Sequence, residues 1–228
     1  CIPPVPGGLA LYGGKNSYED YYRHILVQAQ LCDETGISFL LLGGFSNLTE
    51  AKCAVFAAKE ACSLPLCVGL SFGDDLCLES GIDPAKAVIT LQALGVNAIG
   101  VLSDSSADDT LELLAQMKEF SAVPLFAIPG ISEFMTPEAF GEYMPEYVNY
   151  KAAILGTING GPAYTAAVSK NIWQLEPFRP DFYEVNAVTG IHDIFFYDFN
   201  GQVIGSKKRL LEISIEKEEE TEAIIKKL

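Results

Sequence analysis

The chain has 228 residues, 49% of them apolar and 20% charged, and 15 Lys and Arg stand against 30 Asp and Glu for a formal net charge of −15. This composition is that of a globular protein with a buried core. The acidic balance argues against nucleic acid and anionic membrane surfaces as partners, because both need clustered basic residues and only residues 207–209 form a basic run.

Neither a membrane span nor a secretory signal is visible in the sequence. No apolar run approaches the ~18 residues that a spanning helix needs, and residues 1–6 (CIPPVP) lack a charged region followed by an apolar one. The six cysteines, at positions 1, 32, 53, 62, 67 and 77, form no CxxC pair. We therefore expect a cytoplasmic protein with free thiols, no nucleic-acid contact and no membrane contact.

Strand and helix patterns alternate through the first three quarters of the chain. Apolar, β-rich runs begin at residues 37, 64, 96, 123 and 150, so that successive starts lie 27 to 32 residues apart. Helical patterns cover residues 17–34, 48–61, 84–94, 108–120 and 137–148, and another helix is expected to start at Pro162. Asn47 and Glu50 are spaced as a capping box. This order predicts βαβ units and a parallel sheet, and the equal spacing favours a TIM-type (β/α)8 barrel over an open sheet.

The last quarter has a different pattern. After Trp173 the alternation stops, and strand patterns appear over 181–188 and 191–199, followed by Asn200-Gly201, which is typical of a hairpin turn. Residues 215–228 read as a charged, solvated helix. The predicted domains are a barrel portion over 1–173 and a β-hairpin and helix extension over 174–228.

The fold predicts where ligands bind. In a parallel barrel, functional groups lie at the carboxyl ends of the strands and in the loops that follow. No strand end carries a His or Cys, which removes the usual general base, thiol nucleophile and soft-metal ligand. The Gly160-Gly161 turn before Pro162 is either a tight turn or an anion site on free backbone N–H groups. Small polar residues near the strand ends are the candidate substrate-pocket residues: Gly43, Ser71, Ser103, Asp104, Thr157 and Asn159. For Asp104, a helix or turn cap is the alternative interpretation.

Three segments carry a resemblance to a known family. They are Leu41–Cys53 (LLGGFSNLTEAKC), Leu64–Phe72 (LPLCVGLSF) and Gly95–Ser103 (GVNAIGVLS). These segments resemble the homocysteine S-methyltransferase family, including the homocysteine-binding barrel of cobalamin-dependent methionine synthase. The resemblance covers residues 1 to about 173. It implies a TIM barrel, methyl transfer to a small molecule, and cobalamin or folate as methyl donor.

The resemblance also implies a zinc ion held by three cysteines, which lowers the pKa of the homocysteine thiol. The positions of these cysteines correspond to Ser103, Thr157 and Ile158, and a family Glu near the substrate amine corresponds to Gly43. Hydroxyls and an alkyl side chain supply neither the charge nor the softness of thiolates. We therefore expect no zinc ion at this site.

The resemblance further implies that early barrel units are missing. Residues 1–8 match the end of the family's third strand, so a partner polypeptide or a further domain is expected to supply the missing strands, unless the strands at 181–206 complete the barrel. Three functions stay open: zinc-free methyl transfer to a small molecule, a catalytically inactive binding or scaffolding subunit, and an anion- or phosphate-binding barrel.

Overall fold

The computed structural model describes residues 1–176, 187–189, 194–197 and 203–206. The chain divides into two compact units, residues 1–182 and 183–228. Among the helices of the described residues, none is long and apolar enough to cross a membrane.

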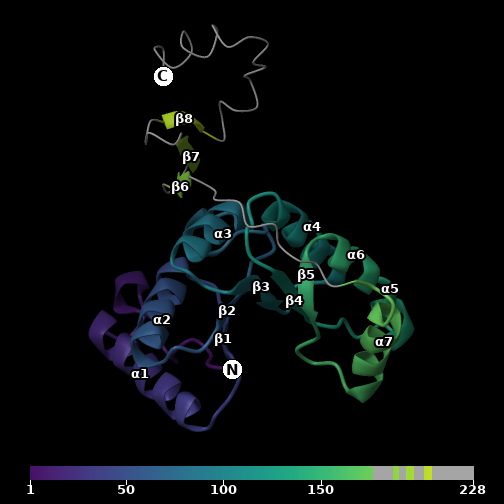
Figure 1. Cartoon of the computed structure of the whole chain (residues 1–228), viewed down its shortest axis with the longest axis horizontal. Helices are drawn as coiled ribbons and strands as arrows, with labels where there is room; N and C mark the ends of the chain where they lie inside the picture. Colours follow the sequence, from purple (N-terminus) through teal and green to yellow (C-terminus); the bar gives the residue numbers. More distant parts are fainter. Residues whose placement is uncertain (177–186, 190–193, 198–202, 207–228) are drawn as a thin grey trace, which may run out of the picture. The chain divides into compact units, whose positions relative to one another are not determined.

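The first unit is built on a parallel sheet of five strands in the order β1-β2-β3-β4-β5. Each strand pairs in parallel with the next along the chain, as consecutive βαβ units do. The expected α/β class is confirmed, and the unit is part of a TIM-type barrel (Figure 1). The strands are β1 (Leu40–Phe45), β2 (Leu66–Leu70), β3 (Ala98–Ser103), β4 (Leu125–Pro129) and β5 (Ala152–Leu155).

Helices follow each strand and lie along one side of the sheet, where they form an arc from α1 to α7 (Figure 1). They begin where polar caps were expected: Asn47 accepts hydrogen bonds from the backbone of Thr49 and Glu50 at the start of α2. The helices are α1 (Tyr18–Glu34), α2 (Leu48–Ala61), α3 (Pro84–Ala93), α4 (Ala107–Lys118), α5 (Pro137–Glu142), α6 (Met144–Asn149) and α7 (Pro162–Ile172), with short 3-10 turns η1 (Ala10–Tyr12) and η2 (Glu79–Gly81).

Two details differ from the sequence prediction. The single helix expected over 137–148 is two helices that meet at Tyr143, because Pro145 has no N–H to continue the first helix and instead lies in the first turn of the second. The capping box at α2 is only half formed. Glu50 does not return to Asn47 but accepts hydrogen bonds from the Leu9 backbone and the Tyr21 hydroxyl.

The two faces of the sheet are packed differently. The helix side carries fully buried residues such as Leu42, Val68 and Val101. The opposite side, here called the inner face, would line the interior of a closed barrel. Its residues form a separate, smaller cluster: Cys67, Ala98 and Phe126 are buried, and Leu41, Leu102 and Ile128 are partly buried against them.

The N-terminal segment extends the sheet beyond β1. Ile2 forms a parallel bridge with Leu42: its N–H donates to the Leu41 carbonyl at 2.8 Å, and its carbonyl accepts from the Gly43 N–H at 3.0 Å. The pairing places the loop over residues 5–16 at the same end of the sheet as the other strand-to-helix loops.

The second unit contains an antiparallel sheet of three strands in the order β6-β7-β8. β7 (Ile194–Tyr197) and β8 (Val203–Ser206) are the two arms of the expected hairpin, and β6 (Ala187–Thr189) pairs with β7. The predicted turn at 200–201 and the predicted helix at 215–228 lie outside the described residues, as does most of the strand predicted over 181–188.

Candidate functional site

The carboxyl ends of β1–β5 and the loops after them form one edge of the sheet, here called the mouth. Ser71 follows β2, Ser103 ends β3, and Thr157 and Asn159 follow β5, so these predicted residues lie at this edge. Gly43 lies inside β1 instead, two residues before the strand ends at Phe45. A Cβ at Gly43 would contact Cys1 Sγ and Leu102 Cδ1 at 3.2 Å each, so there is little room for a carboxylate at this position.

Ser103 and Asp104 have separate environments at the end of β3. Ser103 is 5% exposed, and its Oγ lies 2.6 Å from Ser105 Oγ. Asp104 is exposed. Of the two cap roles considered for Asp104, the helix cap is wrong, because Ser106 caps α4 by accepting from the Asp109 N–H; a turn cap stays a prediction.

Thr157 and Asn159 tie the loop after β5 to the loop after β4. The Thr157 hydroxyl donates to the Pro129 carbonyl at 3.0 Å. Asn159 accepts from the Ile131 N–H at 2.7 Å and donates to the Ile131 carbonyl at 3.2 Å. The Gly130 N–H donates to the Ser103 carbonyl in turn. The structure thus brings Ser103, Thr157 and Asn159 into one hydrogen-bonded frame in which the Thr157 and Asn159 side chains bond main-chain atoms.

The Gly160-Gly161 turn also has a packing role. A Cβ at Gly160 would collide with Thr157 Cγ2 and with Ile131 Cδ1, the latter at 2.7 Å, whereas Gly161 has open space and caps α7. Pro162 occupies the first turn of α7, as expected. Close packing therefore explains Gly160, and anion binding by this turn stays a prediction.

The residues that the resemblance assigns to the family's zinc positions do not fit a zinc ion. Ser103 and Thr157 present neutral hydroxyls that already make hydrogen bonds, and Ile158 presents an alkyl chain. Zinc in proteins is held by thiolates, imidazoles or carboxylates. In the part of the chain that the structure describes, no three His, Cys, Asp or Glu residues are grouped so that they could hold a metal.

The two buried thiols, Cys67 of β2 and Cys53 of α2, are not activated. Cys67 belongs to the inner face, and burial raises the pKa of its thiol. Burial likewise raises the pKa of Cys53 on α2. Because the thiolate is the nucleophile and the metal ligand, neither residue replaces the missing cysteines.

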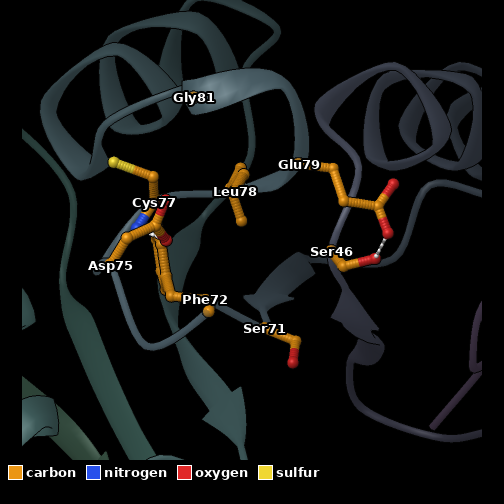
Figure 2. A pocket seen from close by; sticks show the side chains of 9 residues that line it. Ser46, Ser71, Phe72, Asp75, Cys77, Leu78, Glu79 and Gly81 are labelled. Atoms are coloured by element: carbon orange, nitrogen blue, oxygen red, sulfur yellow. Dashed lines mark hydrogen bonds between the residues drawn. The ribbon is translucent and has the colours of Figure 1, made fainter.

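A pocket of about 410 Å³ opens at the mouth between the ends of β1 and β2 (Figure 2). Its size is within the range of small-molecule sites. Ser46 directly follows β1, and the remaining lining comes from residues 71–81 of the loop that joins β2 to α3. The lining residues are Ser46, Ser71, Phe72, Gly73, Asp75, Cys77, Leu78, Glu79 and Gly81.

Hydrogen bonds fix Glu79 at one side of this pocket. Its Oε1 accepts from the Ser46 hydroxyl at 2.8 Å, and its Oε2 accepts from Asn47 Nδ2 at 3.4 Å. Its N–H donates to the Ser46 carbonyl at 2.9 Å. Figure 2 shows Glu79 and Ser46 on one side of the pocket and Asp75 and Cys77 on the other. The carboxylate of Glu79 is therefore held in place before any ligand arrives.

Only Ser71 of the predicted pocket residues lines this pocket, and Glu79 was not predicted. The signal that could have found Glu79 is the length of the segment between β2 and α3. It runs from residue 71 to residue 83 and carries three acidic residues before η2 ends. A loop of this length after a barrel strand is usually functional.

Comparisons with known proteins agree with this architecture. The family model for homocysteine S-methyltransferase matches residues 1–170. This chain belongs to the homocysteine S-methyltransferase family. No curated protein matches it in sequence.

Solved structures of one member of this family resemble the fold. The apo form of the homocysteine methyltransferase MmuM from Escherichia coli superposes with a TM-score of 0.62 at 17% identity, over 75% of this chain and 60% of MmuM. The oxidized form gives 0.56 at 16% over 65% of this chain and 52% of MmuM, and the metallated form gives 0.56 at 18% over 68% and 52%. This chain therefore spans less than two thirds of the length of MmuM.

Proposed function

We propose that this homocysteine S-methyltransferase family member binds a small molecule in the pocket between β1 and β2 and methylates it without zinc. The observation that carries the proposal is the position of the pocket. It lies at the carboxyl ends of parallel barrel strands, where barrel enzymes bind their substrates. Family membership over residues 1–170 supports methyl transfer as the reaction class.

The transfer itself is a displacement at carbon. A lone pair of the acceptor forms a bond to the methyl carbon, while the bond from that carbon to the donor atom breaks and its electron pair stays with the donor. The proton of the acceptor leaves to solvent through the open pocket. The protein's contribution is orientation, which Ser46 and Glu79 provide through their fixed hydrogen bonds.

The absence of a zinc donor set has a kinetic consequence for a thiol acceptor. A free thiol has a pKa near 8.5, so only about 3% of it is thiolate at neutral pH. Zinc would lower that pKa, whereas the hydroxyls of Ser103 and Thr157 carry no positive charge that could lower it. Methyl transfer to a thiol is therefore expected to accelerate as pH rises through about 8.5.

The test measures the transfer of an isotopically labelled methyl group from methylcobalamin or a methylated folate to homocysteine and to small amines. The full chain is assayed with a chelator and with added zinc. We expect turnover that neither treatment changes, and a rate at least about tenfold lower for Ser46→Ala than for the exposed control Glu112→Gln. Loss of turnover on chelation, or a rate profile that is flat from neutral pH upward, overturns the zinc-free proposal.

A specific observation favours a second candidate, a binding subunit without catalysis. Thr157, at one of the family's zinc positions, donates to a main-chain carbonyl and so serves the loop structure. Ligand binding in the pocket with no labelled product from any donor and acceptor pair would favour this candidate over methyl transfer.

A further inference from the structure

The lining of the pocket between β1 and β2 carries negative charge and is richer in charged hydrogen-bond acceptors than in charged donors. Two of its nine lining residues, Asp75 and Glu79, carry carboxylates, and the lining contains no Lys, Arg or His. Nothing in the lining therefore offers a positive charge to a carboxylate or a phosphate.

Most backbone N–H groups of the pocket lining are also engaged within the protein. Anion sites without basic side chains depend on unused backbone N–H groups. Six of the nine lining residues have their N–H engaged in this way: Ser71 donates to Phe45, Gly73 to Cys77, Leu78 to Ile82, Glu79 to Ser46 and Gly81 to Leu78, while the Cys77 N–H donates to Asp75 Oδ1.

The loop that carries Asp75 is held rigidly despite an unfavourable backbone conformation. Leu76 has a φ of +57°, which is unusual for a residue with a branched side chain. The Leu76 N–H donates to Gly73 and the Gly73 N–H donates to Cys77, each at 2.9 Å, so the turn is closed from both sides. Asp75 is thereby held across the pocket from Glu79 (Figure 2).

Apolar side chains complete the lining. Phe72 and Leu78 are buried beneath the polar rim. They provide a surface for a short carbon chain, and at one side of it lies the carboxylate of Glu79, which accepts from the Ser46 hydroxyl and has further lone pairs for a ligand's N–H. A ligand that matches this arrangement has an N–H-bearing positive end and an apolar body.

We propose that this pocket binds small aliphatic ammonium compounds that carry no carboxylate, with the nitrogen donating to Glu79. The inference concerns the pocket in which we place the proposed function and rests on that function for its location only. Binding is measured without a methyl donor, so a failed methyl-transfer assay leaves it standing. It also separates this chain from a binder of amino acids, because the carboxylate of an amino acid would have no partner in the pocket.

The experiment compares ligands that share one carbon chain and differ only in their end groups: n-butylamine, n-butanol, butyrate and γ-aminobutyrate. Binding to the full chain is followed by calorimetry and by the rise in melting temperature. We expect n-butylamine to bind at least about tenfold more tightly than γ-aminobutyrate or butyrate, with butanol between them.

Two variants with equal charge separate the pocket from general attraction to an acidic protein. Glu79→Gln is expected to weaken n-butylamine binding about tenfold. Glu112→Gln, on the exposed side of α4 and away from the lining, is expected to leave it unchanged. If Glu79→Gln fails to fold, Asp75→Asn provides the same comparison. Equal losses in the pocket variant and in Glu112→Gln, or equal binding of butyrate and n-butylamine, would overturn the proposal.

Discussion

The hydroxyl of Tyr21 on α1 donates a hydrogen bond to Glu50 Oε2 on α2 at 3.1 Å, and both side chains are buried. The other oxygen of Glu50 accepts from the Leu9 N–H at 2.8 Å, and the Tyr21 hydroxyl accepts from the Val5 N–H at 3.3 Å. One pair of side chains thus fastens the N-terminal loop to the first two helices. The close approach depends on Gly8, where a Cβ would lie 3.0 Å from Glu50 Oε1.

Replacing Tyr21 by Phe is expected to destabilise the protein by about 1–3 kcal/mol, because Glu50 would keep a buried charged oxygen without its donor. Urea unfolding followed by circular dichroism measures the change. Tyr22→Phe is the matched control, since Tyr22 lies on the same helix as Tyr21 and its hydroxyl donates to Glu60 of α2 in an exposed hydrogen bond. Equal losses in the two variants would show that burial of the Tyr21–Glu50 pair has no energetic importance.

The raised pKa of the buried Tyr21 hydroxyl leads us to expect a loss of stability in alkaline solution. Burial raises the pKa of Tyr21 above its ordinary value of about 10, and the charge of Glu50 raises it further. As pH rises past about 10, the unfolded chain loses the Tyr21 proton while the folded chain keeps it, so the unfolded state binds fewer protons and stability falls.

Between about pH 9 and pH 11, wild type should therefore lose more unfolding free energy than Tyr21→Phe, which lacks the titrating group. Part of the loss should persist in the variant, because burial also raises the pKa of Tyr147. Unfolding curves across this pH range give the comparison. If the unfolding free energies of the two proteins fell in parallel with pH, the alkaline loss of stability would not come from Tyr21.

The sequence was sufficient to predict the parallel sheet because its signals are local. Each of the five strands starts two or three residues after the start of a predicted apolar run, and α2 occupies the predicted range of 48–61. The break between α5 and α6 was missed because Pro145 was treated as a helical position. The hydrogen bonds of Glu50 were not predicted because its partners, Leu9 and Tyr21, are distant in sequence.

The candidate site was less predictable for a similar reason. Strand ends could be located, but whether Thr157 or Asn159 faces a ligand or a neighbouring loop depends on contacts about 28 residues away along the chain. Glu79 lies at the mouth only because its loop folds back to Ser46. The supply of missing strands by another polypeptide, the cytoplasmic location and the domain boundary after residue 173 stay predictions.

The inner face should tolerate no added side chain at Gly100. A Cβ there would collide with the carbonyl oxygen and the ring of Phe126. Gly100→Ala is expected to cost about 1–3 kcal/mol of stability, since a sheet and a buried ring must shift together. Gly161→Ala is the control, because that position has open space and a negative φ, and its change should stay within about 1 kcal/mol. Thermal unfolding of both variants decides whether the inner face is tightly packed.

Variants of Thr157 distinguish a role in lining a ligand site from a purely structural role. If its hydroxyl only supports the loop after β4, Thr157→Val should lower stability by about 1 kcal/mol and leave n-butylamine affinity unchanged. Thr157→Ser keeps the hydroxyl and should preserve most of the hydrogen bond to Pro129. Because the pocket between β1 and β2 does not include Thr157, an affinity loss in Thr157→Val that Thr157→Ser restores would place the ligand at the β5 end of the mouth. That result would favour the pocket predicted from the sequence over the one that the structure outlines.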